Sequence, residues 1–326
     1  MLAIFPAVFL VFLELTVGSF LALWLLDLRG DTSRGFVIFQ GALYLVFGLL
    51  TILAMNAFAS VQALSGFGLD MGWLSRQAPL VITFTLLMLP WNVLLWRDKG
   101  SSPNAKRKRD EPATTGIPPL RMARFIAGGV ASAVGLIAVF ADGMAFRTMA
   151  DSRLGGAFVV AAFLAGAIAI GAVMTAMLLG HWYLNTPTAS GRPLEFVTTL
   201  TLGALALAFF CALLVGPSTA HVTGQVISPG TTIRNGPNGV TIIQPTPGPA
   251  GTPPATEVRQ TPLDTTAFFV LEVIVGGIAP LALAAVALHL TRGRSFQSAT
   301  GMLYLCVAFV FLGEIMARGL LLFPAM

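Results

Sequence analysis

The stretch Phe311-Leu-Gly-Glu-Ile-Met-Ala-Arg-Gly-Leu-Leu-Leu322 lies in the last long apolar segment of the chain and carries two opposite charges, Glu314 and Arg318. A charged side chain at the centre of a bilayer costs roughly 2.5 kcal/mol or more, so such residues usually face a bundle interior or a water path. A related string, Phe140-Ala-Asp-Gly-Met-Ala-Phe-Arg147, closes an earlier apolar segment. We therefore expect charged residues with a functional role inside a membrane-embedded helical bundle.

Composition places the whole chain in the membrane class. Of its 326 residues, 56% are hydrophobic and only 10% are charged, against about 25% charged in a soluble domain. The net charge of +5 does not indicate nucleic-acid binding, because the basic cluster Lys106-Arg-Lys-Arg109 lies in a loop between apolar segments. Such a loop sets topology or contacts anionic lipid. We expect membrane lipid, and no nucleic acid, among the partners.

Eight segments are long and apolar enough to cross a bilayer as helices, which takes about 20 residues each. The predicted spans are roughly 3–26, 36–58, 79–96, 122–146, 155–180, 194–216, 265–290 and 296–322. Most Lys and Arg residues lie in the loops after spans one, three, five and seven. The positive-inside rule then places both termini outside. The sequence predicts a multi-pass protein of the bacterial cytoplasmic (inner) membrane with both termini extracytoplasmic.

The two halves of the chain resemble each other, which predicts an all-α integral membrane fold of two parallel-oriented four-helix bundles, residues 1–150 and 151–326. Because four spans is an even number, both halves would have the same orientation in the membrane. The matching features are Pro90 with Pro280, Asp142-x-Met-Ala145 with Glu314-x-Met-Ala317, and Leu15-Thr-Val-Gly18 with the Ala169-Ile-Gly171 region. Small-residue motifs such as Ala162-x-x-x-Gly166 favour close helix packing.

The connection at 218–264 is rich in Pro, Gly and Thr. Residues 222–227 and 240–244 are candidate short strands beside the turn signals of Asn235-Gly-Pro-Asn-Gly239. The segment is interpreted either as a flexible extracytoplasmic loop or as a docking surface for a partner.

The intramembrane charges supply the candidate catalytic residues Glu314, Arg318, Asp142 and Glu272. Glu314 and Arg318 are four residues apart and can meet on one helix face, either as a structural ion pair or as a carboxylate tuned to accept a proton. Asp142 and Arg147, five apart, need not touch. Glu272 is expected at a depth comparable to Arg318.

Glu14 and His181 are candidate cofactor-binding residues. Glu14 is the most isolated charge in the first span, where structural hydrogen bonding and a proton relay are equally good interpretations. His181 stands in Gly-His-Trp-Tyr-Leu-Asn185, and the aromatic neighbours also suit a simple membrane-interface role. The sequence has no Cys-x-x-Cys-His motif, so we expect no covalently attached haem.

Two stretches resemble the NrfD-type membrane subunits of polysulfide reductase and dimethyl-sulfoxide reductase. They are Pro6-Ala-Val-Phe-Leu-Val-Phe-Leu-Glu-Leu-Thr-Val-Gly18 and Leu303-Tyr-Leu-Cys306 with Phe311-Leu-Gly-Glu-Ile-Met-Ala-Arg318. The resemblance implies two four-helix bundles without haem that exchange electrons with a quinone, menaquinone or ubiquinone. It also implies a quinone site near the extracytoplasmic helix ends, beside an iron–sulfur partner and a catalytic subunit.

The leading hypothesis is therefore a quinone-interacting membrane-anchor subunit of a respiratory oxidoreductase, in which buried Glu and Arg residues handle the quinol protons. A secondary transporter or permease is the main alternative, because mid-membrane prolines and repeats also occur there. A third interpretation is an accessory subunit with no site of its own.

Overall fold

The computed structural model describes residues 4–58, 69–98, 119–150, 153–186, 189–215, 231–235, 241–245 and 265–322. Within these ranges, eight helical segments are long and apolar enough to cross a membrane. The predicted all-α integral membrane fold is confirmed. The helical elements are α1 (Ile4–Arg29), α2 (Arg34–Phe58), α4 (Met71–Arg97), α5 (Pro119–Phe146), η2 (Arg147–Met149), α6 (Arg153–Asn185), α7 (Arg192–Val215), α8 (Thr265–Glu272), η3 (Val273–Ile278), α9 (Ala279–Arg292) and α10 (Phe296–Leu322).

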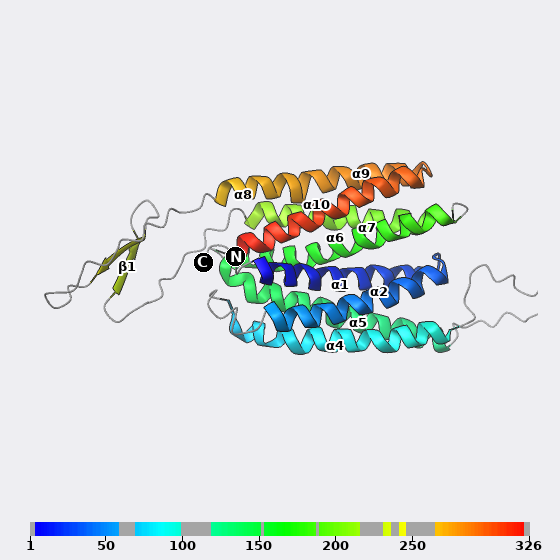
Figure 1. Ribbon diagram of the computed structural model, residues 1–326, viewed down its shortest axis with the longest axis horizontal. Helices are drawn as coiled ribbons and strands as arrows, with labels where there is room; N and C mark the ends of the chain where they lie inside the picture. Colours follow the sequence, from blue (N-terminus) through cyan, green and yellow to red (C-terminus); the bar gives the residue numbers. More distant parts are fainter. Residues whose placement is uncertain are drawn as a thin grey trace, which may run out of the picture.

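The helices pack side by side and alternate in direction, so that α1 begins and α10 ends at the same end of the helical body (Figure 1). Helices α1, α2, α4 and α5 contact one another in a ring, and α6, α7, α9 and α10 form a second ring. Contacts of α6 with α1 and α5, and of α10 with α1, join the two rings. The internal repeat suggested by the sequence stays a prediction.

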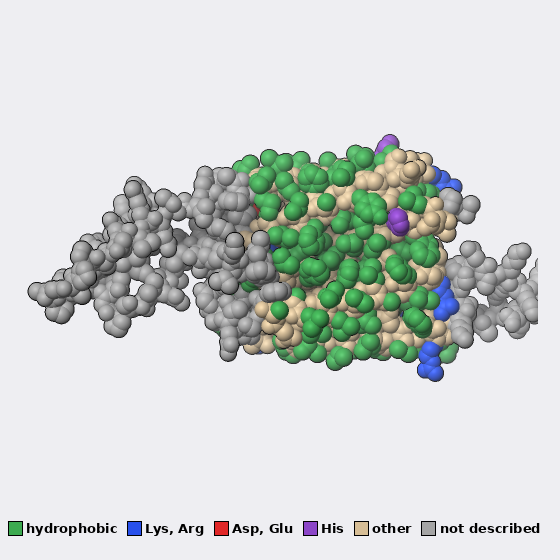
Figure 2. Space-filling model, viewed as in Figure 1, with side chains coloured by type: hydrophobic (Ala, Val, Ile, Leu, Met, Phe, Trp, Pro, Cys, Tyr) green, Lys and Arg blue, Asp and Glu red, His purple; other side chains and the backbone are tan. Residues whose placement is uncertain are grey.

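The sides and the ends of the helical body differ in chemistry. Apolar side chains cover the face seen in Figure 2, and Lys and Arg side chains gather at the end where α1 ends and α2 begins. We call this the basic end. An apolar belt with basic residues at one end is what a multi-pass helical protein presents to lipid. α1 lies at the centre, with Phe9, Leu13 and Phe20 fully buried.

Two glycines bring α1 and α6 into backbone contact. A Cβ atom added to Gly18 would overlap the carbonyl of Ala167, and one added to Gly171 would overlap the backbone of Gly18. Small residues are used in this way in membranes, where dispersion contacts between closely packed helices replace the hydrophobic effect as the driving force. The two rings are therefore joined through a contact that admits no side chain.

Two spans differ in extent from the sequence prediction. α4 begins at Met71 rather than near residue 79, because the Asp70 carboxylate caps it by accepting a hydrogen bond of 3.0 Å from the Gly72 amide. α6 runs on to Asn185 rather than ending near residue 180. The Tyr183 hydroxyl there donates a 2.7 Å hydrogen bond to the Ser190 carbonyl.

The seventh span is not one regular α-helix. α8 passes into η3, a stretch of π-helix at Val273–Ile278, before α9 continues to Arg292. Single π-helical turns inside α-helices are rare and occur frequently at functional sites. Pro280, just after η3, cannot donate a backbone hydrogen bond, which fits the irregularity at this point.

The long connection contains a two-stranded antiparallel hairpin, β1 (Thr231–Asn235) and β2 (Thr241–Pro245), with Ile233 opposite Ile243. β2 lies one residue from the predicted strand at 240–244. The other predicted strand, at 222–227, lies outside the described residues, and β1 is the strand that pairs with β2. Asn235, the first residue of the predicted turn signals, is the last residue of β1.

The contact between α1 and α6 predicts a large difference in stability between alanine substitutions at two glycines, one inside the contact and one outside it. Gly171→Ala places a methyl group against the Gly18 backbone, and overpacking of this kind costs about 1–3 kcal/mol. Gly203→Ala in α7 is the matched control, because nothing lies within 4 Å of its added Cβ. Thermal unfolding of the purified protein in detergent should show a lower Tm for Gly171→Ala only. Equal Tm values would contradict the packing.

Candidate functional site

Arg318 in α10 is the centre of a buried ion cluster. Its Nη2 lies 2.6 Å from Glu14 Oε1 in α1 and 2.9 Å from Glu314 Oε2 one turn earlier in α10. Its Nε donates a hydrogen bond of 2.9 Å to the same Glu14 oxygen. The Arg318 side chain is only 3% exposed, that of Glu14 1%, and that of Glu314 12%. We call Glu14, Glu314 and Arg318 the acid–arginine triad.

α6 completes the surroundings of the triad. The guanidinium carbon of Arg318 lies 3.9 Å from the centre of the Phe163 ring, a cation–π contact. Three residues along, Gly166 leaves room for the charges, because a Cβ there would come within 2.6 Å of Glu314 Oε1 and 2.8 Å of Arg318 Nη2. The triad thus needs both a flat aromatic surface and a missing side chain on the same helix.

Asp142 forms a second polar contact in the interior. It is 2% exposed, and its Oδ1 accepts a hydrogen bond of 2.6 Å from Gln77 Nε2 in α4. Its charge interacts with those of Arg318 and Glu14. Arg147 does not contact it and instead lies 3.4 Å from Asp70 at the surface. The expectation that Asp142 and Arg147 need not touch is consistent with this arrangement.

Glu272, the last residue of α8, is half-buried. Its charge interacts with those of Glu314 and Arg318. η3 follows directly, and its Gly276 packs on Gly313 of α10, where an added Cβ would lie 2.8 Å from the Gly313 Cα. The irregular turn of the seventh span therefore lies against the segment that carries Glu314.

The charges of the cluster do not balance. Two carboxylates of the triad share one guanidinium, so the triad carries one excess negative charge unless one carboxyl group holds a proton. An uncompensated charge in a low-dielectric interior is expensive, which favours a single shared proton. Glu14 Oε2 is buried and has no hydrogen-bond partner in the described structure. This oxygen is the position best suited to hold a proton or to accept one from a ligand.

The structure brings three of the sequence-predicted residues, Glu14, Glu314 and Arg318, into direct contact. The charge of a fourth, Glu272, interacts with those of Glu314 and Arg318. Asp142 joins them electrostatically. From the sequence, Glu14 was expected to be an isolated charge. In the structure it is paired, because Arg318, which is 304 positions away along the chain, donates a hydrogen bond to it. The contributions of Phe163, Gly166 and Gln77 were not anticipated. Only Gly166 had a signal, as part of a small-residue motif.

His181 lies elsewhere. It is exposed, and its Nδ1 is 3.2 Å from the hydroxyl of Tyr304 on α10. Tyr304 precedes Glu314 by ten residues, roughly 15 Å along the helix. The structure therefore does not place His181 with the acid–arginine triad, and its setting suits the membrane-interface role.

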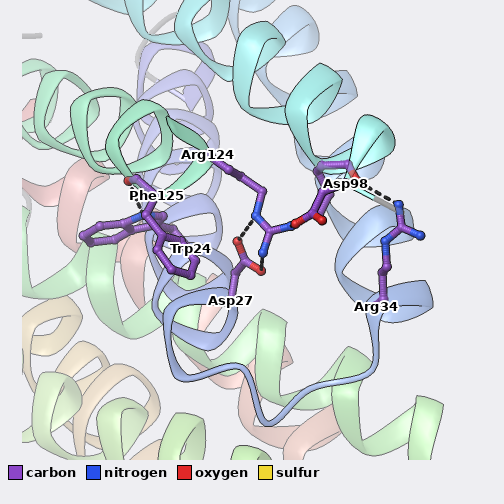
Figure 3. A network of polar contacts seen from close by, with 7 residues as sticks. Trp24, Asp27, Arg34, Asp98, Arg124 and Phe125 are labelled. Atoms are coloured by element: carbon purple, nitrogen blue, oxygen red, sulfur yellow. Dashed lines mark hydrogen bonds and ion pairs between the residues drawn. The ribbon is translucent and has the colours of Figure 1, made fainter. Parts of the chain in front are cut away.

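A second buried ion network, which sequence reasoning missed, lies near the basic end (Figure 3). Arg124 of α5 is 4% exposed. Its Nε and Nη2 each lie 3.0 Å from an oxygen of Asp27 in α1, and its Nη1 lies 2.7 Å from Asp98 Oδ2 after α4. Beside it, Trp24 Nε1 donates a 3.0 Å hydrogen bond to the Phe125 carbonyl. This network ties α1, α4 and α5 together.

Comparison with protein-family models, curated proteins and solved structures finds no match to this chain.

Removing the cation of the triad should leave two buried carboxylates without their partner. Arg318→Met is therefore expected to lower the free energy of unfolding by about 3–5 kcal/mol, the loss typical of a broken buried ion pair. Arg292→Met is the matched control, because Arg292 pairs with Glu195 at 2.8 Å on the surface, with 61% and 41% of these side chains exposed. Such exposed pairs contribute about 0–1 kcal/mol. Denaturant unfolding in detergent would measure both. Similar losses in the two variants would contradict the buried-pair description.

Proposed function

We propose that this protein is a membrane-anchor subunit of a quinone-linked oxidoreductase in a bacterial cytoplasmic membrane. In this proposal the acid–arginine triad is the proton-handling part of a quinone site. Iron–sulfur and catalytic partner subunits on the extracytoplasmic side exchange the electrons. The observation that carries the proposal is the excess of carboxylates over arginine in a buried cluster, together with the orphaned oxygen Glu14 Oε2.

The residues present fit the chemistry of such a ligand. A quinol supplies two electrons and two protons on oxidation to the quinone. A buried carboxylate oxygen without a partner can accept a proton from a quinol hydroxyl. Before it does so, the Arg318 guanidinium beside it compensates the negative charge of the carboxylate. Glu272, half-buried and close enough to interact with Glu314, provides the next carboxylate toward the end where α8 begins.

The position of the cluster also supports the proposal. The triad lies in the last turns of α10, toward the end opposite the basic end. If the basic end faces the cytoplasm, as the positive-inside rule predicts, the triad lies in the extracytoplasmic half. A partner iron–sulfur protein on that side would be near it. The resemblance to NrfD-type subunits predicts a site in this half as well.

The test replaces one carboxylate of the triad without changing its shape. Glu14→Gln should lower quinol oxidation by the assembled complex by about 100-fold, the lower end of what a positioned proton acceptor contributes. Glu195→Gln removes a carboxylate from an exposed ion pair at the basic end and should retain wild-type turnover. An assembled Glu14→Gln complex with unchanged turnover would reject the role of the triad.

A proton-coupled secondary transporter is the second candidate, and η3 is the observation that favours it. Transporter sites near the membrane midplane are commonly built beside discontinuous helices. Here the π-helical turn, Pro280 and the Gly276–Gly313 contact adjoin the carboxylates. A carboxylate pair that shares one arginine can load and release a proton in such a cycle as well.

The two candidates differ in their partners. For the oxidoreductase subunit, gentle purification of the protein from its native membrane should yield co-purifying subunits that contain iron and acid-labile sulfide. The chain purified alone, with proton uptake into vesicles that is abolished by Glu14→Gln and kept in Glu195→Gln, would instead identify a transporter.

A further inference from the structure

We propose that a pocket at the basic end binds a phosphate group, carried by an anionic lipid headgroup or by free inorganic phosphate. The polar side chains that line the pocket are those of Asp27, Thr32, Arg34, Arg121 and Arg124, and Gly30 lies among them. We call it the basic pocket. It is independent of the acid–arginine triad, since Asp27 follows Glu14 by thirteen residues of α1, roughly 20 Å along the helix.

The basic pocket carries a net positive charge. Three arginines and Asp27 line the pocket, and Asp98 pairs with Arg124 beside it, which gives 3 − 2 = +1. Both aspartates are engaged by Arg124. Arg34 uses its Nη2 to donate to the carbonyls of Leu95 and Trp96 at 3.0 and 3.3 Å. Arg34 and Arg121 form no ion pair within the described part of the chain, so the surplus positive charge lies on them.

The basic pocket also contains buried hydrogen-bond donors without partners. The Nε atoms of Arg34 and Arg121 and the hydroxyl of Thr32 are buried without a hydrogen-bond partner in the described structure. Thr32 is only 7% exposed and lines the pocket. Buried polar groups are normally satisfied, and an exception calls for an explanation such as a bound ion. Guanidinium and hydroxyl donors around one space match the three acceptor oxygens of a phosphate group.

The backbone supports the same assignment. α2 begins at Arg34 and α5 begins at Pro119, so two helix N-termini with their positive dipole ends lie beside the pocket. Gly30, at the turn between α1 and α2, has a φ of +70°, a conformation open to glycine at no steric cost. A Cβ at Gly30 would lie 3.0 Å from Arg121 Nη2. The glycine therefore permits both the tight turn and the close approach of this guanidinium.

The position of the pocket at the membrane interface lets a lipid headgroup supply the phosphate. It lies where α1 and α4 end and where the exposed residues Arg29, Trp96 and Arg97 mark a membrane interface. Figure 2 shows the basic side chains gathered at this end. Free phosphate has the same chemistry and would reach the pocket from the aqueous side, so the experiment must separate the two sources.

The test measures the Tm of the delipidated full-length protein in a neutral detergent, with phosphatidylglycerol, phosphatidylcholine or inorganic phosphate added. We expect saturable stabilisation by phosphatidylglycerol, by inorganic phosphate or by both, and the arm that stabilises identifies the source. Arg121→Gln should raise the apparent Kd by roughly tenfold or more, the loss of about one charge-assisted hydrogen bond. Thr32→Val, which keeps the shape of the side chain, should also weaken binding.

Arg292→Gln is the control, because it removes an exposed arginine from the same end of the helical body. It should keep the wild-type response. The proposal is overturned if the wild-type protein responds to neither phosphatidylglycerol nor phosphate, or if phosphatidylcholine stabilises as strongly as phosphatidylglycerol. It is also overturned if Arg121→Gln and Thr32→Val bind as tightly as the wild type.

Discussion

The salt bridge between Arg318 and Glu14 joins the last helix of the chain to the first, and the interior of the protein is arranged around it. A guanidinium can remain buried only if carboxylates and a suitable surface replace its water shell. Glu14 and Glu314 supply the carboxylates, and Phe163 supplies the surface. The absence of a side chain at Gly166 is part of the same requirement, because any larger residue would occupy the place of the charges.

α1 connects the two polar regions of the molecule. Its Glu14 belongs to the acid–arginine triad and its Asp27 to the Arg124 network near the basic end. Between them, Gly18 meets Gly171 and fixes α1 against α6. An apolar helix with one buried charge near its middle, another near its C-terminal end and a glycine contact between them cannot slide or rotate without breaking at least one buried ion pair. The rigid centre therefore sets the geometry of both sites.

The element that packs beside the triad, η3, is a π-helix rather than a regular α-helix. η3 replaces regular α-helical hydrogen bonding in the seventh span, and its Gly276 rests directly on Gly313, next to Glu314. The excess carboxylate of the triad, the unpartnered oxygen Glu14 Oε2 and the π-helical turn η3 thus lie in the same region of the protein. This combination supports proton handling in either proposed function. A quinone-linked subunit and a proton-coupled transporter both need a carboxylate that can change its charge while a fixed arginine limits the cost.

Composition and apolar length by themselves determined the class of the protein and the number of spans, because transfer of about 20 apolar residues into lipid depends on local sequence alone. The i, i+4 relation of Glu314 and Arg318 was likewise local and was predictable from helix geometry. The partners that lie far apart in the chain were not. Glu14 looked isolated, and Arg124 looked like one more basic residue near a span boundary, although each is buried against an opposite charge.

Only the tertiary structure decided these pairings, because they depend on which helices are neighbours and on how each helix is rotated about its axis. The same holds for the basic pocket, whose residues come from the end of α1, the start of α2 and the start of α5. Within each segment those residues are unremarkable in type and spacing. Their role depends on helix packing, which pairs each buried aspartate with Arg124 and leaves the surplus positive charge beside the basic pocket.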